Sequence, residues 1–97
     1  MKNLAAIKKS IRDQKETLRD RYKVHRIGLF GSYVRGDTHR GSDLDVLVEF
    51  SEPVSLLNLV SLENYLTSIV GIKVDVVPEE TLRKELKNSI LDTVVYL

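Results

Sequence analysis

Apolar residues recur every three or four positions in three long segments of the chain, at residues 3 to 22, 55 to 70 and 81 to 91. This spacing places them along one side of a helix, so the sequence predicts three amphipathic helices. Ser55 is suited to cap the second helix and Gly71 to end it. The positions expected to face inward are Leu4, Ile7, Ile11, Leu18 and Tyr22 in the first helix, Leu56, Leu59, Leu62, Leu66 and Ile69 in the second, and Leu82, Leu86 and Ile90 in the third.

Between these helices, short segments alternate apolar and polar residues, which is typical of strands. The sequence predicts strands at residues 24 to 30, 43 to 50 and 72 to 77, the last ended by Pro78, and a short edge strand within residues 93 to 97. In the second strand, one face carries Leu44, Val46, Val48 and Phe50, and the other carries Asp43, Asp45, Leu47 and Glu49. This order of elements predicts an α/β fold in which helices flank a small mixed sheet of three or four strands.

The length and composition narrow the class of protein. We expect residues 1 to 97 to form a single domain, with too little chain for a second substrate-binding domain. There is no cysteine, which excludes disulfides and thiolate metal sites. No apolar run approaches the roughly 20 residues of a membrane span, and the start of the chain lacks the apolar segment of a signal peptide. We therefore expect a cytoplasmic protein that does not contact membranes.

Positive charge gathers at the start of the chain. Residues 1 to 26 hold nine Lys or Arg against three acids, a net charge of +6, whereas the remaining residues have a net charge of −5. A basic helix can contact an acidic partner or nucleic acid. A solvated helix face explains the same residues equally simply, and no aromatic residues lie between them to stack on bases. Direct nucleic-acid binding is therefore the weaker hypothesis.

A glycine-containing loop and two carboxylates lie close together in the sequence. Gly31 and Ser32 follow the first predicted strand and open a loop, residues 31 to 42, in which small residues let a phosphate chain approach the backbone. After ten intervening residues, Asp43 and Asp45 alternate on an extended segment, so both carboxylates point to one face about 7 Å apart along the chain. Such a pair can bind one or two hard divalent cations through oxygen.

A third carboxylate, Asp75, lies alone within the predicted strand at residues 72 to 77. If that strand neighbours the one that carries Asp43 and Asp45, three carboxylates converge at one edge of the sheet. Like charges at short range disfavour joint ionisation, and a divalent cation removes that conflict. Mg²⁺ prefers carboxylate, water and phosphate oxygens and usually lies between protein and nucleotide, so the sequence predicts a magnesium site.

Three strings in the chain together resemble the minimal nucleotidyltransferases of the DNA polymerase beta superfamily. They are GSYVRG from Gly31, SDLDVLV from Ser42 and VDVV from Val74. The Gly-Ser pair, the ten-residue interval and the Asp-x-Asp pair match the family signature without a gap, and the resemblance covers essentially the whole chain. It implies a polymerase-beta-like nucleotidyltransferase fold, with ATP as substrate and two Mg²⁺ ions as cofactors.

The resemblance also implies a role for each motif residue. Asp43 and Asp45 would ligate both Mg²⁺ ions, while Asp75 would complete the shell of the second ion and accept a proton from the acceptor hydroxyl. Two such ions stabilise the attacking and leaving oxygens of an in-line displacement at phosphorus. Gly31 and Ser32 would hold the β and γ phosphates.

Smaller members of the family resemble the antitoxins of toxin–antitoxin modules, in which AMP from ATP is added to a tyrosine of a HEPN ribonuclease (higher eukaryotes and prokaryotes nucleotide-binding). The resemblance therefore implies a HEPN-domain toxin as partner, in a hetero-oligomer. A protein acceptor also suits a short chain with little surface to enclose a small molecule. Two alternatives stay open: a non-catalytic module that neutralises a toxin by covering its site, and nucleotidyl transfer to a small molecule with a second subunit.

Five further polar or aromatic residues each have two interpretations. Arg35 would neutralise charge on the phosphates or the leaving pyrophosphate, or is a surface arginine. His25 and His39 are more typical of surface histidines than of ligands or bases. Arg40 could contact nucleotide or only solvent, and Tyr33 could stack on adenine or pack locally.

The second predicted helix carries more apolar residues than a single inward stripe requires. The residues concerned are Leu56, Leu57, Leu59, Val60 and Leu62. They form either a partner interface or a broad core face, and the sequence favours the interface.

Overall fold

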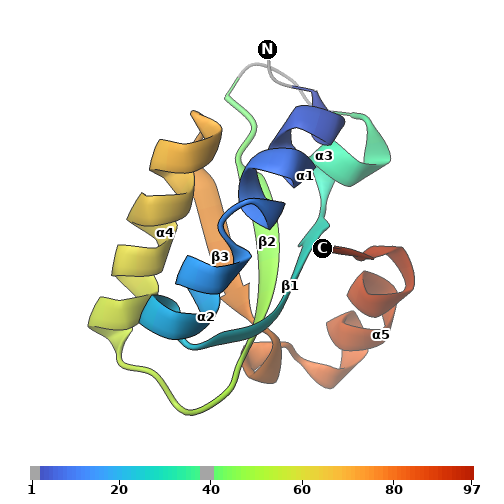
Figure 1. The fold of residues 1–97 in the computed structure, drawn as a ribbon. Coiled ribbons are helices and arrows are strands. Elements are labelled where there is room, and N and C mark those ends of the chain that lie inside the picture. Colours follow the sequence, from blue (N-terminus) through green and yellow to red (C-terminus); the bar gives the residue numbers. More distant parts are fainter. Residues whose placement is uncertain (1–2, 38–40) are drawn as a thin grey trace.

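The computed structural model describes residues 3 to 37 and 41 to 97 (Figure 1). The helices are α1 (Leu4–Arg12), α2 (Lys15–Tyr22), α3 (Ser32–Arg35), α4 (Leu56–Val70) and α5 (Lys84–Thr93), with a 3₁₀ turn, η1 (Glu79–Thr81). The strands are β1 (Val24–Phe30), β2 (Leu44–Phe50), β3 (Val74–Pro78) and β4 (Val95–Tyr96). The predicted α/β fold with a small mixed sheet is confirmed, and the predicted loop after β1 contains one helical turn, α3.

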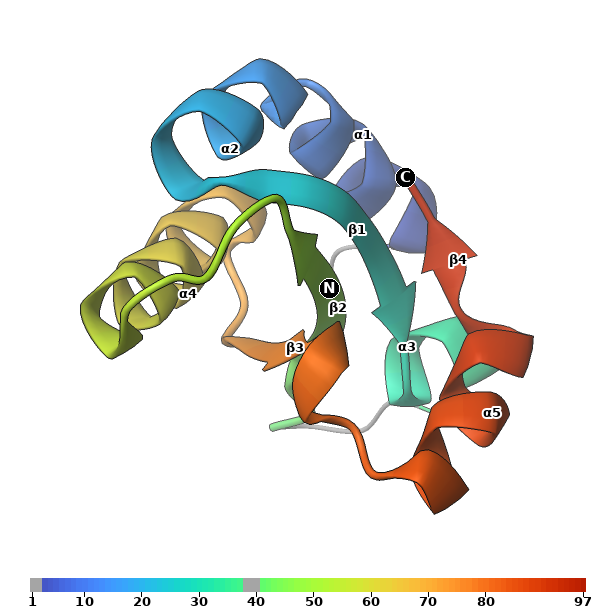
Figure 2. The same cartoon turned by 90° about the horizontal axis from the view of Figure 1, so that it is seen from below.

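The strands form one sheet in the order β3-β2-β1-β4. β2 pairs in parallel with β3 and antiparallel with β1, and β1 pairs antiparallel with the short β4. Figure 2 shows α1 and α2 on one side of β1 and α5 on the other. Because β2 lies between β1 and β3, the end of β1 and the starts of β2 and β3 meet at one edge of the sheet, where their residues can form a common site.

The segment predicted as one helix, residues 3 to 22, is instead two helices, so that prediction is wrong at its centre. α1 ends at Arg12 with Asp13 as its C-cap, and Gln14 has non-helical dihedral angles, φ −106° and ψ 12°. The Gln14 side chain accepts a hydrogen bond of 2.8 Å from the hydroxyl of Tyr65 on α4. Ile11 and Leu18, on either side of the break, are both buried.

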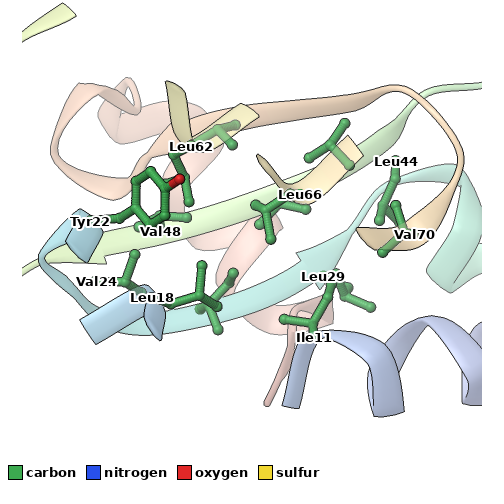
Figure 3. Close-up of a cluster of buried hydrophobic side chains, with 14 of the residues drawn as sticks. Ile11, Leu18, Tyr22, Val24, Leu29, Leu44, Val48, Leu62, Leu66 and Val70 are labelled. Atoms are coloured by element: carbon green, nitrogen blue, oxygen red, sulfur yellow. The ribbon is translucent and has the colours of Figure 1, made fainter. Parts of the chain in front are cut away.

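The core lies between the sheet and the helices α1, α2 and α4 (Figure 3). Its fully or nearly fully buried residues come from all of these elements: Ile7, Ile11, Leu18, Tyr22, Val24, Ile27, Leu29, Leu44, Val46, Val48, Leu62, Leu66, Val70, Val74 and Val76. Burial of this much aliphatic surface is the main stabilising contribution to such a domain. It also fixes β2, the strand that carries Asp45, between its two neighbours.

Two inward positions were predicted wrongly. Leu56 is 75% exposed because it is the first residue of α4, directly after the Ser55 cap, and it lies outside the packed part of the helix. Leu86 is 53% exposed because α5 packs loosely and contributes no buried residue. Within the part of the chain that the structure describes, no helix is both long and apolar enough to cross a bilayer.

Candidate functional site

The turn from β1 into α3 passes directly against Asp45. Gly31 has φ 80° and ψ −154°, a conformation that is essentially restricted to glycine. A Cβ atom added to Gly31 would collide with the Oδ2 atom of Asp45 and lie only 3.0 Å from its Cγ atom. The glycine of the predicted phosphate loop is therefore in contact with a carboxylate of the predicted metal site.

Strand register brings the predicted acids together at the backbone level. Asp45 lies opposite Phe30 on β1 and opposite Asp75 on β3. Asp43 directly precedes β2, two residues before Asp45 and on the same face. The expectation that the strand of Asp75 neighbours that of Asp43 and Asp45 is thus confirmed.

An open groove of about 510 Å³ lies over this edge of the sheet. It is lined by Phe30, Gly31, Ser32, Arg35, Gly41, Ser42, Asp43, Asp45 and Ile90. Five of the six predicted site residues line it; the sixth, Asp75, is exposed on the adjacent strand. Phe30 and Ile90 were not predicted. Phe30 could have been inferred as the neighbour of Gly31, whereas no local signal marks Ile90, which reaches the groove only through the placement of α5.

The charge of Asp45 is disfavoured in the folded protein. Partial burial, the largest cause, raises the pKa of its carboxyl, and repulsion from Asp75 and then from Asp43 raises it further. Arg35 acts in the opposite direction and offsets part of this effect. The three acids therefore interact electrostatically, as the sequence predicted.

Two cations lie beside the acids. The Nε atom of Arg35 is 3.2 Å from Oδ2 of Asp37, and the Nζ atom of Lys73 is 3.8 Å from Oδ2 of Asp43. Both pairs are solvent-exposed, and such pairs contribute little stability. They leave Arg35 and Asp43 able to bind other charged groups.

The donor set suits a hard divalent cation. Its side chains are carboxylates, which Mg²⁺ prefers, and the repulsion that raises the pKa of Asp45 is relieved by a bound cation. Within residues 3–37 and 41–97, no three acidic or histidine side chains are grouped closely enough to hold an ion as they lie. The strands thus supply the ligands, and the carboxylates must turn toward one another to share an ion.

Two of the remaining candidate residues, Tyr33 and His25, lie in the described part of the chain. Tyr33 is partly buried and packs against the hydrophobic core, which favours local packing over stacking on a base. His25 is 67% exposed and 3.7 Å from Glu49. His39 and Arg40 lie outside the described residues.

Comparison with known proteins decides the family. A family model of a nucleotidyltransferase domain matches residues 11–97. The chain belongs to this family. The match includes every residue of the candidate site, from Gly31 to Asp75, and it confirms the prediction of a nucleotidyltransferase enzyme.

Two relatives of this nucleotidyltransferase match over its whole length. A protein of Methanocaldococcus jannaschii, provisionally named a protein adenylyltransferase, is 42% identical over 98 residues, which cover 100% of both chains. Protein adenylyltransferase MntA of Thermococcus cleftensis is 41% identical over 97 residues, which cover 100% of this chain and 98% of MntA.

Solved structures agree with this assignment. One, provisionally described as a minimal nucleotidyltransferase, has a TM-score of 0.75 and 34% identity and covers 92% of this chain and 94% of its own. A toxin–antitoxin structure with AMP-PNP has a TM-score of 0.69 and 27% identity, and the match covers 95% of this chain and 69% of the chain in that structure. A Shewanella oneidensis complex of tri-AMPylated HEPN toxin with MNT antitoxin has a TM-score of 0.68 and 22% identity. The match covers 93% of this chain and 70% of the chain in that complex, and it shows only a shared fold. The resemblance to minimal nucleotidyltransferases is confirmed.

Replacing Asp45 with asparagine should stabilise this nucleotidyltransferase when it holds no nucleotide or metal. The folded state raises the pKa of Asp45 above its ordinary value of 3.8, so ionisation of this carboxyl lowers the free energy of unfolding. This loss of stability is absent well below pH 3.8, where the carboxyl is protonated in both states, and it grows as the pH rises through the folded-state pKa. We expect the melting temperature of Asp45→Asn to exceed that of the wild type by a few degrees near neutral pH and to match it in acid.

Thermal unfolding followed by circular dichroism, in the presence of a chelator, measures this difference. Asp20→Asn is the matched control, since Asp20 is an exposed acid that forms an ion pair of 3.0 Å with Arg19. That variant should gain no stability. A lower melting temperature for Asp45→Asn at neutral pH would show that the carboxylate stabilises the fold.

Proposed function

We propose that this chain transfers AMP from Mg-ATP to a tyrosine hydroxyl of a HEPN-domain toxin and acts as its antitoxin. The observation that carries the proposal is the contact of Gly31 with Asp45, beside Asp75 on the next strand. It joins the loop suited to phosphate with the acids suited to Mg²⁺ in one groove. Relatives named protein adenylyltransferases and a toxin–antitoxin structure with AMP-PNP support the choice of AMP and of a toxin partner.

The residues of the groove have distinct roles in this proposal. Asp43, Asp45 and Asp75 would hold Mg²⁺, which supplies charge stabilisation to the phosphates and to the attacking and leaving oxygens. The backbone of Gly31 and the hydroxyl of Ser32 bind the β and γ phosphates, because a residue without a side chain lets this turn lie directly against the carboxylate of Asp45.

Transfer forms a bond between the acceptor oxygen and the α phosphorus and breaks the bond to pyrophosphate. Asp75 accepts the proton of the acceptor hydroxyl; its exposed position on β3 lets an incoming side chain reach it. Arg35, also exposed, balances the charge that develops on the leaving pyrophosphate. The proton then passes from Asp75 to solvent.

The shape of the groove favours a macromolecular acceptor. It is open to solvent, and the side of β3 that bears Asp75 is exposed. A small acceptor would have few protein atoms around it there, whereas a protein partner brings its own binding surface and encloses the reacting atoms. No feature of the groove favours a small-molecule acceptor.

Incubation with α-labelled ATP, Mg²⁺ and the purified product of the neighbouring gene tests the proposal. We expect label on that protein, and loss of label when its acceptor tyrosine is replaced by phenylalanine. An unlabelled but folded partner would contradict AMP transfer to it. If the partner were then still inhibited, the non-catalytic binding hypothesis would replace the proposal.

Replacing Ile90 with alanine should weaken ATP binding with little effect on the turnover rate. Ile90 lines the groove from α5 and is only half-buried, so its truncation removes apolar contact without opening the core. We expect the KM for ATP to rise about fivefold, which corresponds to about 1 kcal/mol of lost apolar contact. Leu86→Ala, at an exposed position of the same helix, is the control and should leave KM unchanged. Equal effects of both variants would assign the change to the stability of α5.

A further inference from the structure

The first half of β1 has a sheet edge that no strand covers. β4 pairs with Gly28 and Leu29, and the N–H of Leu97 donates a hydrogen bond of 2.9 Å to the carbonyl of Ile27. Among the described residues, none pairs with the same edge from Val24 to Arg26. In Figure 2, α2 lies at the start of β1 and β4 beside its end. The backbone groups along this edge can therefore accept a further strand in line with β4.

A groove of about 490 Å³ follows this uncovered edge. It is lined by Lys15, Leu18, Arg19, Val24, His25, Arg26, Ile27, Ser51 and Leu97 and shares no lining residue with the groove over Asp45. Its buried floor is aliphatic, whereas its rim is basic and includes no acidic residue. An aliphatic floor beside a strand edge accommodates alternate side chains of an added strand.

The basic rim selects the kind of segment that can bind. Arg26 is paired with Glu49 and Glu79. Arg19 has an ion pair with Asp20, and His25 lies 3.7 Å from Glu49, but both contacts are exposed and contribute little. Lys15, Arg19 and His25 therefore remain able to bind acidic side chains. A second copy of this chain would place the same cations opposite one another, so self-pairing is disfavoured.

We propose that this groove binds an acidic, extended segment of a partner protein, which adds to the sheet as a strand along Val24 to Arg26. Its backbone pairs with β1, its apolar side chains cover the aliphatic floor, and its carboxylates contact the cations of α2. This site is separate from the proposed AMP-transfer groove, so it gives the chain a second surface for a protein. The proposal holds whether or not AMP transfer occurs.

Binding of a synthetic peptide tests the proposal. The probe is a peptide of about seven residues that alternates Glu and Val, near the typical length of a strand. We expect saturable changes in the backbone amide NMR signals of residues 24 to 27 and of α2, with a dissociation constant below about 1 mM. A peptide with N-methyl groups on alternate backbone nitrogens should not bind, nor should one with Lys in place of Glu.

Charge reversal on the rim provides a second measurement. Lys15→Glu combined with Arg19→Glu should weaken peptide binding by about tenfold or more, since opposite charges become like charges. Lys84→Glu combined with Lys87→Glu makes the same charge change on α5, outside the groove, and is the matched control. No saturable binding, signal changes confined to another surface, equal binding of the N-methylated peptide, or equal loss in both double variants would each overturn the proposal.

Discussion

Replacing both Asp43 and Asp45 with asparagine will reduce AMP transfer by about 10³-fold or more and leave the fold intact. Asparagine keeps the size of each side chain but removes the negative charge that holds a cation beside the phosphates. Even residues that only orient such ligands commonly cost 10- to 100-fold in affinity or activity when they are replaced. Because burial and the neighbouring acids raise the pKa of Asp45, we expect that the fold does not require its charge.

Initial rates of label transfer from α-labelled ATP measure this loss, and circular dichroism verifies that the double variant is folded. Asp20→Asn, which removes one exposed acid on α2, should transfer AMP at the wild-type rate. Transfer by the double variant at that same rate would exclude these two carboxylates from the reaction. Full inhibition of the toxin by a variant that transfers no AMP would assign neutralisation to binding.

The sequence predicted the parts of the site that depend on local pattern. The alternation around Asp45 located β2, and the glycine and serine after an apolar run located the turn into α3. The long-range assumption was that the strands of Asp45 and Asp75 are neighbours; their parallel pairing, which was not predicted, places Asp75 opposite Asp45. These few residues were sufficient to predict the site because the hydrogen-bond register between neighbouring strands fixes which residues lie side by side.

The features that the sequence did not reveal depend on tertiary packing. The break at Gln14 is stabilised by Tyr65, which lies far along the chain on α4. The periodicity of α5 predicted burial of Leu86, yet the outer face of the sheet is small and α5 covers it loosely. Ile90 lines the groove because of where α5 packs, and the sequence of α5 does not specify that position.

Replacing Gly31 with alanine will both destabilise the protein and impair AMP transfer, whereas the same change at Gly36 will affect stability alone. Both glycines have positive φ, 80° and 82°. At Gly36 the backbone is left-handed helical and a Cβ would meet no atom within 4 Å, so the cost is about 1–2 kcal/mol of backbone strain. At Gly31 the conformation is one that only glycine adopts readily, and the Cβ would also collide with the carboxylate of Asp45.

The collision at Gly31 has to be relieved by movement of the turn or of Asp45. A displacement of about 1 Å in a reacting group can cost 100-fold in rate, so we expect Gly31→Ala to lose at least that much activity beyond its loss of stability. Urea denaturation and label transfer, measured on both variants, separate the two effects, because Gly36→Ala reports strain without the collision. Equal transfer rates for the two variants would mean that the contact between Gly31 and Asp45 has no part in catalysis. A slower rate for Gly31→Ala, measured in conditions where both variants are fully folded, would show that catalysis requires the loop to lie against the carboxylate.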